Sequence, residues 1–342
     1  MFHPHYHISA KLLENIKQIT LIVADFNRKK NPDALVTEFE KNAHEISSYS
    51  SNSIQGNPLA LAEVKKILKD TPEHAKDSEK EILNYDRTLQ ELNTMIEENT
   101  TDISLNLILK VHKGIMKGLI PKEKLGKLRN EPISIDNEKT GKLIYLPPDY
   151  KDITRLLNEL ITYTQKNRQK IDPLILSGIF HKQLVIIHPF IDGNGRTTRL
   201  MTKLLLSSLG LNTFNLFSFE NYYNKNVTQY FQKVGVFGNY YEIKDTIDFT
   251  SWLEYFTKGI IDELLRVQKN LHDRSITPEN DLKPFHLKML NTIEKKGYIN
   301  DAEYAKLVKR AKATRNLDFK KMIELEKIQR YGKGKNTYYK LT

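Results

Sequence analysis

The sequence lacks several features whose absence narrows the class of protein. It has no cysteine, which excludes disulfides, thiolate metal sites and a cysteine nucleophile. No apolar run is long enough to cross a membrane, because even the longest, residues 201–211, is interrupted by Lys203 and two serines. The first residues lack the basic and then apolar layout of a signal peptide. We therefore expect a cytoplasmic protein with no membrane partner, although a secreted bacterial protein would also fit the lack of cysteine.

Charge is present in an ordinary amount but is unevenly placed. Of the 342 residues, 28% are charged and 39% are apolar, as in soluble proteins, and this length suits two or three domains. The net charge is +11, and residues 281–342 alone carry +9 of it. This asymmetry predicts two functional units with different partners.

Apolar residues recur at helical spacing along most of the chain, which predicts a mainly α fold. The expected helices cover residues 12–19, 59–68, 82–95, 100–118, 150–166, 173–187, 200–209 and 215–270, the last with a polar stretch at 238–246. The helix over 173–187 has the strongest start, because Asp172 is a good N-cap and Pro173 suits the first helical position. It is apolar on most sides, so it should be buried within a helical bundle.

One stretch alternates apolar and polar residues as strands do. Residues 132–135 and 143–146 alternate around turn residues at 136–141, which predicts a small β-hairpin. Its candidate contact residues are Ile133, Ile135, Ile144 and Tyr145. An exposed hairpin edge can bind an extended peptide by strand addition. A hairpin that only covers the bundle is the alternative.

Residues 188–199 read His-Pro-Phe-Ile-Asp-Gly-Asn-Gly-Arg-Thr-Thr-Arg and follow the predicted buried helix. The two glycines allow backbone N–H groups to surround an anion, and the next helix directs its N-terminus at the same point. Arg196 and Arg199 share one face of that helix and suit phosphate, because a guanidinium donates paired hydrogen bonds. Asp192 is an oxygen ligand suited to Mg²⁺, and His188 can accept a proton near neutral pH. Each residue alone has an ordinary structural explanation, but together they favour an anion site.

This string resembles the signature of the Fic family, His-Pro-Phe-x-Asp-Gly-Asn-Gly-Arg-x-x-Arg, at every specified position. The hairpin, preceded by Gly-Lys-Leu-Arg at residues 126–129, looks like the family's target-binding flap. The N-terminal helices and the basic C-terminal domain are similar to those of Fic proteins with a winged-helix tail. The resemblance implies a Fic-type helical bundle with a β-hairpin flap and a C-terminal winged helix-turn-helix domain.

The resemblance also implies a protein adenylyltransferase, which transfers AMP from ATP to a Ser, Thr or Tyr hydroxyl of a target protein or of itself. By position, His188 would deprotonate that hydroxyl. Asp192 would hold Mg²⁺ between the α- and β-phosphates of ATP. Phe190 would anchor the loop in the core.

The remaining ligands of ATP are also implied by position. Asn194, with the backbone of Gly193 and Gly195, would hold the α-phosphate, while Arg196 would bind the β-phosphate and Arg199 the γ-phosphate. Tyr230 and Phe231 lie where the family often has a pair of tyrosines near the adenine. One of them is therefore expected to line the base pocket.

Many Fic proteins carry an inhibitory helix with the pattern Ser/Thr-x-x-x-Glu-Gly/Asn, and residues 50–57 read Ser-Ser-Asn-Ser-Ile-Gln-Gly-Asn. Ser51 and Gly56 fit the pattern, but Gln55 stands where Glu is expected. The Glu would pair with Arg199 and block the γ-phosphate. A neutral amide makes a weaker hydrogen bond, so weakened autoinhibition is expected. In some family members that Glu also assists the reverse reaction, and Gln55 puts this activity in doubt.

Residues 285–342 suggest a winged helix, with helices at 285–295, 301–308 and 314–325 and a strand–turn–strand wing at 328–341. Thr314 is the expected N-cap of the third helix. Basic residues on that helix and on the wing suit double-stranded DNA; they are Arg315, Lys320, Lys321, Arg330, Lys333 and Lys335. A protein-docking module with a solvated basic surface is an equal alternative.

These expectations divide the chain into four parts: an N-terminal helical region with a degenerate inhibitory motif (1–98), a Fic catalytic core (99–270), a linker (271–284) and a winged-helix domain (285–342). Two other functions fit the same features. One is a DNA-binding regulator whose Fic domain senses nucleotide, and the other is transfer of another phosphate-containing group. The sequence leaves open the target protein and whether the protein forms a homodimer.

Overall fold

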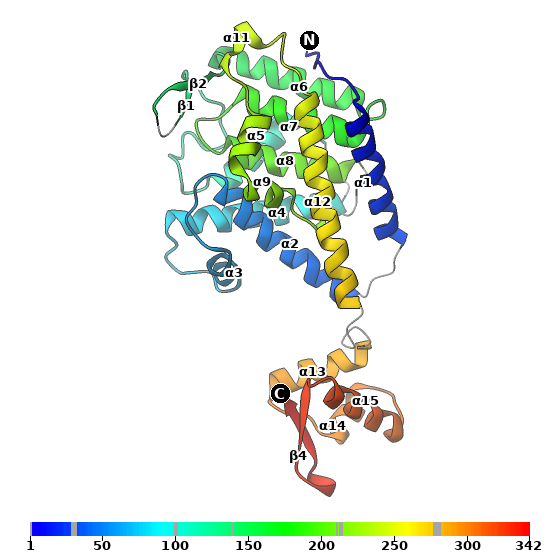
Figure 1. The fold of residues 1–342 in the computed structure, drawn as a ribbon. Helices are drawn as coiled ribbons and strands as arrows, with labels where there is room; N and C mark the ends of the chain where they lie inside the picture. The colour runs from blue at the N-terminus through cyan, green and yellow to red at the C-terminus, as the bar shows by residue number, and fades with distance from the viewer. Residues whose placement is uncertain are drawn as a thin grey trace. The chain divides into compact units, whose positions relative to one another are not determined.

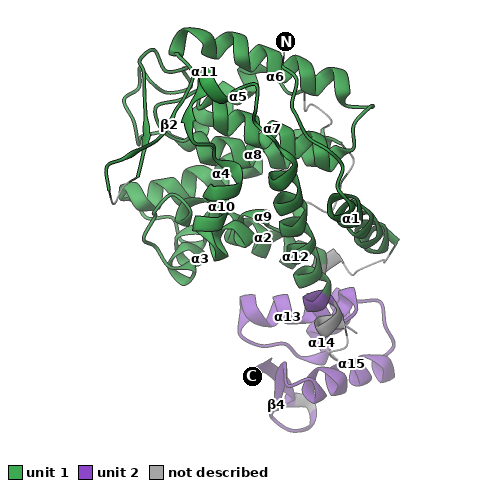
Figure 2. Ribbon diagram, turned by 45° about the horizontal axis from the view of Figure 1, so that its top comes forward, with its two compact units in different colours: residues 1–268 green, residues 269–342 purple. Residues whose placement is uncertain are grey.

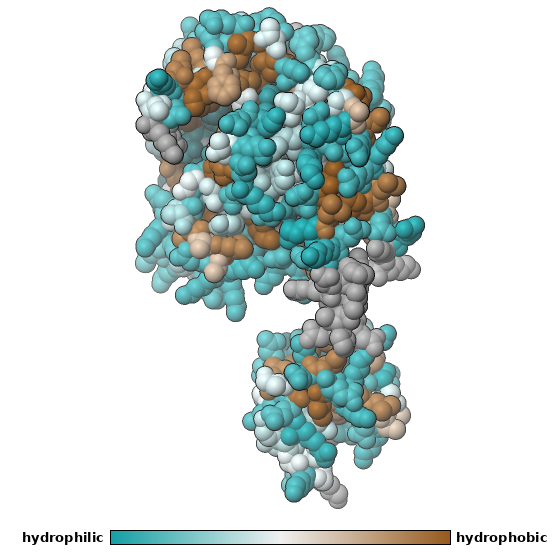
Figure 3. All heavy atoms as spheres, viewed as in Figure 1, coloured by the Kyte–Doolittle hydropathy of each residue, from teal (hydrophilic) through white to brown (hydrophobic). Residues whose placement is uncertain are grey.

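A computed structural model describes residues 2–28, 33–98, 102–137, 140–209, 211, 215–275 and 282–342. The chain folds into two compact units, residues 1–268 and 269–342 (Figure 2). Hydrophilic residues cover much of the face seen in Figure 3, with hydrophobic patches between them. Within the described residues, no helix combines the length and apolar character needed to cross a bilayer.

The first unit is built mainly of helices, as predicted (Figure 1). They are α1 (Ala10–Arg28), α2 (Asp33–Ser53), α3 (Leu61–Lys69), α4 (Asp77–Glu97), α5 (Leu105–Ile115), α6 (Ile153–Asn167), α7 (Pro173–Ile187), α8 (Asn194–Ser208), α9 (Phe219–Lys225), α10 (Val227–Val234), α11 (Tyr240–Ile243) and α12 (Thr250–Ser275). The apolar pattern named no helix over α2, because its buried face is largely polar. The expected helix over 215–270 is divided into α9 to α12.

Helices α7 and α8 lie inside the first unit, and both ribbon views show α1 and α3 at its periphery (Figures 1 and 2). Asp172 caps α7 by accepting a hydrogen bond from Leu174 N at 2.8 Å, and Pro173 occupies the first turn. Almost every side chain of α7 is buried, as its apolar composition predicts. The cap, the proline and the apolar composition are properties of the helix itself, so they do not depend on distant parts of the chain.

A three-stranded sheet lies beside the bundle, in the order β1 (Ile135–Asp136), β2 (Leu143–Leu146), β3 (Gly238–Asn239). The predicted hairpin is confirmed as the antiparallel pair β1 and β2, with Ile135 opposite Tyr145 and a shorter first strand than expected. Residues 138–139 of the predicted turn lie outside the described residues. Strand β3 pairs parallel with β2 and was not predicted, because two residues are too few to show alternation.

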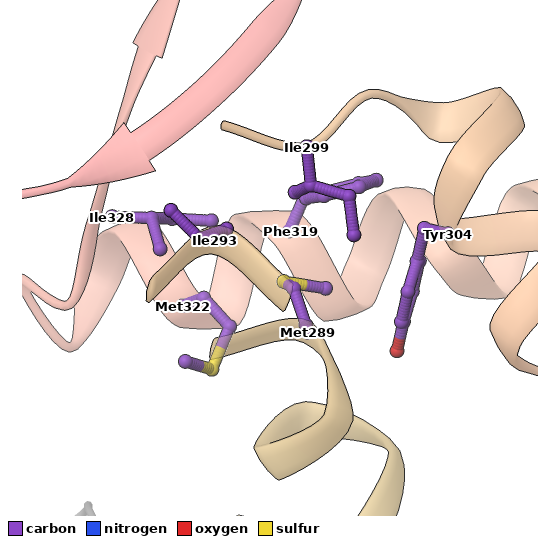
Figure 4. Close-up of a cluster of buried hydrophobic side chains, with 7 residues drawn as sticks. All are labelled: Met289, Ile293, Ile299, Tyr304, Phe319, Met322 and Ile328. Atoms are coloured by element: carbon purple, nitrogen blue, oxygen red, sulfur yellow. The ribbon is translucent and has the colours of Figure 1, made fainter. Parts of the chain in front are cut away.

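The second unit contains α13 (Pro284–Lys296), α14 (Asp301–Leu307), α15 (Lys312–Glu324) and the antiparallel strands β4 (Ile328–Tyr331) and β5 (Tyr338–Leu341). Its core consists of seven residues from these elements and the segment after α13, drawn in Figure 4: Met289, Ile293, Ile299, Tyr304, Phe319, Met322 and Ile328. The order of elements is the predicted one, but Thr314 as N-cap was wrong. Helix α15 begins at Lys312 after Ala311, so Thr314 lies within its first turn.

The four predicted parts of the chain can be compared with the two compact units of the structure. Regions 1–98 and 99–270 fall almost wholly in the first unit, where α4 packs against α2, α5 and α8. Helix α12 extends to Ser275, past the expected start of the linker at 271. Residues 276–281 of that linker lie outside the described residues.

Candidate functional site

The candidate site is the loop between α7 and α8, and His188 begins it. The backbone of His188 is left-handed, with φ +49°, and its N–H donates to Leu184 O at 3.2 Å. A residue before proline avoids the helical region, so Pro189 forces α7 to end here. A left-handed non-glycine residue costs about 1 kcal/mol or more, which the surrounding contacts must offset.

The ring of His188 is held in a form suited to accepting a proton. Its Nδ1 lies 3.3 Å from Val185 O. A carbonyl only accepts, so Nδ1 carries the hydrogen and Nε2 keeps its lone pair. Burial lowers the pKa of His188 to about 4, so the ring is neutral near pH 7. Arg129 fixes the same turn, because its Nε donates to His188 O at 2.9 Å.

The loop is closed by Asn194 and Gly193. The Asn194 amide donates to Phe190 O at 2.8 Å and accepts from Phe190 N at 2.9 Å. Its side chain therefore braces the loop, which leaves its backbone N–H at the start of α8 to face a phosphate. Gly193 has φ +79°, and a Cβ there would lie 2.7 Å from the sulfur of Met116, so this position requires glycine.

Asp192 presents the carboxylate of the loop to solvent. Its side chain is 58% exposed, and its Oδ1 lies 3.4 Å from Arg196 Nη2. The same oxygen accepts from Gly193 N. Across the described residues, no group of three or more His, Asp or Glu side chains could form an all-protein metal site. A single exposed carboxylate beside a phosphate cradle fits Mg²⁺ shared with substrate phosphates, which is how proteins often hold this ion.

Arg196 makes an ion pair that the sequence did not reveal. Its Nη1 lies 2.7 Å from Glu81 Oε1 on α4, and its side chain is only 3% exposed. Asn57 donates to the other oxygen of Glu81 at 2.7 Å. The Nε of Arg196 is buried and makes no hydrogen bond within the described part of the chain. An orphaned guanidinium donor beside the anion loop is consistent with an anionic ligand there.

Arg199 is fully buried and is bound by the end of α2. Its Nε donates to Ser51 Oγ at 2.7 Å, and its Nη2 donates to Ser51 O at 2.8 Å. In the amide orientation that gives both ends of Gln55 suitable partners, Oε1 accepts from Nη2 at 3.1 Å and from Nη1 at 3.3 Å. Gly56 follows with φ +87° and ends the helical turn. The structure thus brings Ser51 and Gln55 to the arginine that the sequence comparison with Fic proteins named.

The buried face of the last turns of α2 is polar. Five of its residues are 0% exposed: Ser47, Ser48, Ser50, Ser51 and Asn52. Lys203 of α8 donates to Ser47 Oγ at 2.6 Å and lies 3.8 Å from the buried carboxylate of Glu220. Among the described side chains, buried apolar residues flank this face, at Phe39 and Ala43 before it and Ile54 after it. This helix end therefore binds α8 mainly through hydrogen bonds.

His112 of α5 is a second residue that sequence reasoning missed. Its ring stacks on Phe190 with centroids 3.8 Å apart and planes within 5°. Its Nδ1 accepts from Gly126 N at 3.1 Å, so its Nε2 carries the hydrogen and donates to Asp192 O at 3.1 Å. Burial lowers the pKa of His112 to about 4, which keeps this tautomer uncharged. No motif in the sequence marks His112, because its partners are distant along the chain.

The other predicted site residues differ in how far their side chains are buried. Tyr230 is buried, and its hydroxyl lies 3.2 Å from His181 Nε2 and 3.5 Å from Arg199 Nη1. Phe231 is 47% exposed. In the flap, Tyr145 is buried and donates to Ile186 O at 3.0 Å, which ties β2 to the end of α7. The other three flap positions, Ile133, Ile135 and Ile144, are half-buried.

A histidine, a glycine-containing loop and two buried arginines thus meet at the junction of α7 and α8. Residues 102–206, which include this loop, match the family model described as Fic/DOC family, and the chain carries a domain of that family.

Named relatives share this part of the chain. A protein adenylyltransferase fic-1 of Caenorhabditis elegans is 28% identical over 207 residues, covering 59% of this chain and 39% of the relative. A protein adenylyltransferase Fic of Aedes aegypti is 30% identical over 175 residues, covering 50% of this chain and 34% of the relative. The chain therefore spans less than half the length of these curated relatives.

Solved structures share the fold. A Fic family protein from Desulfovibrio desulfuricans superposes with a TM-score of 0.74 and 18% identity, covering 100% of this chain and 98% of that one. Fic-1 of Caenorhabditis elegans gives a TM-score of 0.61 and 19% identity over 78% of this chain and 74% of that one. The mainly helical Fic fold is thereby confirmed.

Proposed function

We propose that this protein is a nucleotidyltransferase that moves AMP from ATP to a hydroxyl side chain of a target protein or of itself. The observation that carries the proposal is the state of His188: its ring is neutral, with Nδ1 bound to Val185 O and the Nε2 lone pair retained, on the anion-binding loop. The names of the relatives support the same activity.

The residues take roles that their geometry allows. His188 Nε2 removes the proton of the hydroxyl as its oxygen attacks the α-phosphorus, and pyrophosphate leaves. The N-terminus of α8 and Arg196 and Arg199 offset phosphate charge, and such positioning and charge neutralisation supply most of phosphoryl-transfer catalysis. Asp192 would hold Mg²⁺, which would neutralise phosphate charge. The adenine pocket near Tyr230 and Phe231 stays a prediction.

The flap presents the target. Strand β2 is paired on one side by β1 and on the other by β3, so β1 is one of the two edge strands of this sheet within the described residues. An extended target segment adds to β1 by main-chain hydrogen bonds. Because Tyr145 fixes β2 to α7, the segment is held at a constant distance from His188.

The test uses ATP labelled at one phosphate at a time. Relative to a cell lysate without this protein, incubation of the lysate with the protein and Mg²⁺ should add label from the α-phosphate to protein and none from the γ-phosphate. Since general-base catalysis typically contributes about 10²–10⁴-fold, His188→Ala should lose nearly all incorporation while keeping its helical circular-dichroism spectrum. Label from the γ-phosphate would indicate kinase-like transfer, and no label on any protein would reject the proposal.

We also propose that ATP binding is restrained, but weakly, by the end of α2. Ser51 and Gln55 accept hydrogen bonds from the guanidinium of Arg199, but Gln55 is neutral and cannot form an ion pair with it. The charged restraint is instead the ion pair between Glu81 and Arg196. Both arginines must exchange these partners for phosphate, so the two contacts set the ATP affinity together.

A second candidate function concerns residues 269–342. We propose that this unit is a winged helix that binds double-stranded DNA, since its three helices and β4–β5 hairpin carry exposed cations at Lys320, Arg330 and Lys333. Arg315 is less available than expected, because it forms a bidentate pair with Asp301 at 2.8 and 2.9 Å. The side chain of Lys335 lies outside the described residues.

Fluorescence anisotropy with a labelled duplex tests this candidate. Affinity should fall steeply with salt, and Lys333→Glu should weaken binding to every sequence and reduce the salt slope by about 1. Absence of binding at low salt would leave the unit as a protein-docking module. A cytoplasmic location and a homodimer stay predictions.

A further inference from the structure

A cavity opens beside the candidate site, on the segment that precedes the flap. Its volume is about 330 Å³. It is lined by His112, Ile120, Glu123, Lys124, Lys127, Leu128, Arg129, Asn130 and Ile191. A larger cavity of about 860 Å³ lies along α6 and is lined by no residue of the 188–199 loop. Of these two cavities, the smaller one adjoins the proposed catalytic loop, because Ile191 of that loop lines it.

This cavity is rigidly tied to the loop that carries His188. On one side, His112 stacks on Phe190 and donates to Asp192 O. On the other, Arg129 donates from its backbone N–H to Pro189 O and from Nε to His188 O, both at 2.9 Å. A group bound in the cavity is thus held at a fixed distance from the base.

The charges around the cavity are mainly positive. Lys127 is exposed at its rim, and Lys124 is half-buried and shares its charge with Glu131 at 3.1 Å. Arg129 is 3% exposed and its guanidinium donates hydrogen bonds to three main-chain carbonyls, while the carboxylate of Asp149 offsets part of its positive charge. Glu123 is the one carboxylate among the lining residues.

Part of the cavity lining is apolar. Ile120 and Leu128 are half-buried, and Ile191, the fourth residue of the motif, is 37% exposed. Apolar residues beside cationic ones suit a side chain with a short hydrocarbon stem and a carboxylate at its end.

We propose that this cavity binds a glutamate-like acidic side chain of the target segment, close to the hydroxyl that receives AMP. The inference rests on the proposed transfer of AMP and gives that activity a substrate class: segments with an acidic residue near the modified Ser, Thr or Tyr. The main-chain pairing with β1 then needs no particular sequence, and the cavity supplies the selectivity.

Labelled peptides test the proposal by binding and by transfer. In one set, a single Thr is followed at positions +1 to +4 by Glu, Gln or Lys in turn. The intact protein should bind the best Glu peptide about two- to fivefold more tightly than its Gln partner, as an exposed ion pair allows, and the Lys peptide more weakly still. AMP incorporation from α-labelled ATP should follow the same order in kcat/KM.

A charge reversal provides the sharper comparison. Lys127→Glu should invert the preference so that the Lys peptide binds best. Lys170→Glu is the matched control, because Lys170 is exposed after α6 and does not line the cavity. It changes the net charge equally and should leave the order of peptides unchanged.

The outcomes separate the two proposals. If Thr peptides accept AMP but Glu, Gln and Lys versions bind and react equally, the cavity has no such role. An order that Lys127→Glu leaves intact overturns it as well. If no substrate accepts AMP while the Glu preference in binding persists and inverts in Lys127→Glu, the acidic subsite stands and the transferase function fails.

Discussion

Replacing Gln55 by Glu should convert a neutral contact on Arg199 into an ion pair. The amide Oε1 already lies 3.1 and 3.3 Å from the two terminal nitrogens of Arg199, so a carboxylate of the same size fits without rearrangement. A charge-assisted hydrogen bond contributes ~1.5–3 kcal/mol against ~0.5–1.5 for a neutral one, a gain of ~1–2 kcal/mol. Because Gln55 is exposed, solvent screens the charge, and the lower value of ~1 kcal/mol, about fivefold, is expected.

The assay measures ATP affinity by calorimetry with Mg²⁺ and the rate of AMP incorporation from α-labelled ATP. Gln55→Glu should bind ATP about fivefold more weakly and slow incorporation at subsaturating ATP. Gln55→Ala is the control, since it removes the contact and should bind ATP at least as tightly as the unchanged protein. If Gln55→Glu matches the unchanged protein in both measurements, the end of α2 does not restrain Arg199, and the reasoning is refuted.

Three further perturbations test other parts of the site. Glu81→Gln keeps the shape of the contact but removes its charge from Arg196, so ATP affinity by calorimetry should rise several-fold; a loss of affinity would show that Glu81 positions the arginine instead. Burial lowers the pKa of His188 to about 4, and the neutral form is the base, so kcat/KM for AMP transfer should be flat from pH 5 to 8 and fall only as pH drops toward 4. An acid limb centred near pH 6.5 would contradict this. Gly193→Ala forces a Cβ against Met116 at φ +79°, so urea unfolding should show a loss of ~1–2 kcal/mol, and an unchanged midpoint would mean that the loop relaxes freely.

The parts of the fold that sequence predicts well are those encoded by neighbouring residues. The start of α7 follows from Asp172 and Pro173, and its end follows from the His188–Pro189 pair. The 188–199 loop is contiguous, so its residues were found together. Strand β3 and the polar helix α2 were missed, because one is too short and the other lacks an apolar stripe.

The contacts that complete the site are distant along the chain. Glu81 and Arg196 are separated by 115 residues, and His112 and Asp192 by 80. Nothing local distinguishes Glu81 from the other carboxylates of α4, such as Glu79 and Asp86. Ser51 and Gln55 could be named only through the resemblance to Fic proteins. The ion pair between Arg196 and Glu81 and the hydrogen bond from His112 to Asp192 O could be found only from the three-dimensional structure.

The serine-rich face of α2 has a consequence for the proposed restraint of ATP binding. Hydrophobic contacts hold a helix in place because water cannot replace them, but water can replace the partners of Ser47 and Ser48. We therefore expect the end of α2 to separate from α8 more readily than an apolar helix would. At Arg199, an arriving triphosphate competes with hydrogen bonds to Ser51 and Gln55. The turn that shields Arg199 can open while the bundle beneath it stays folded.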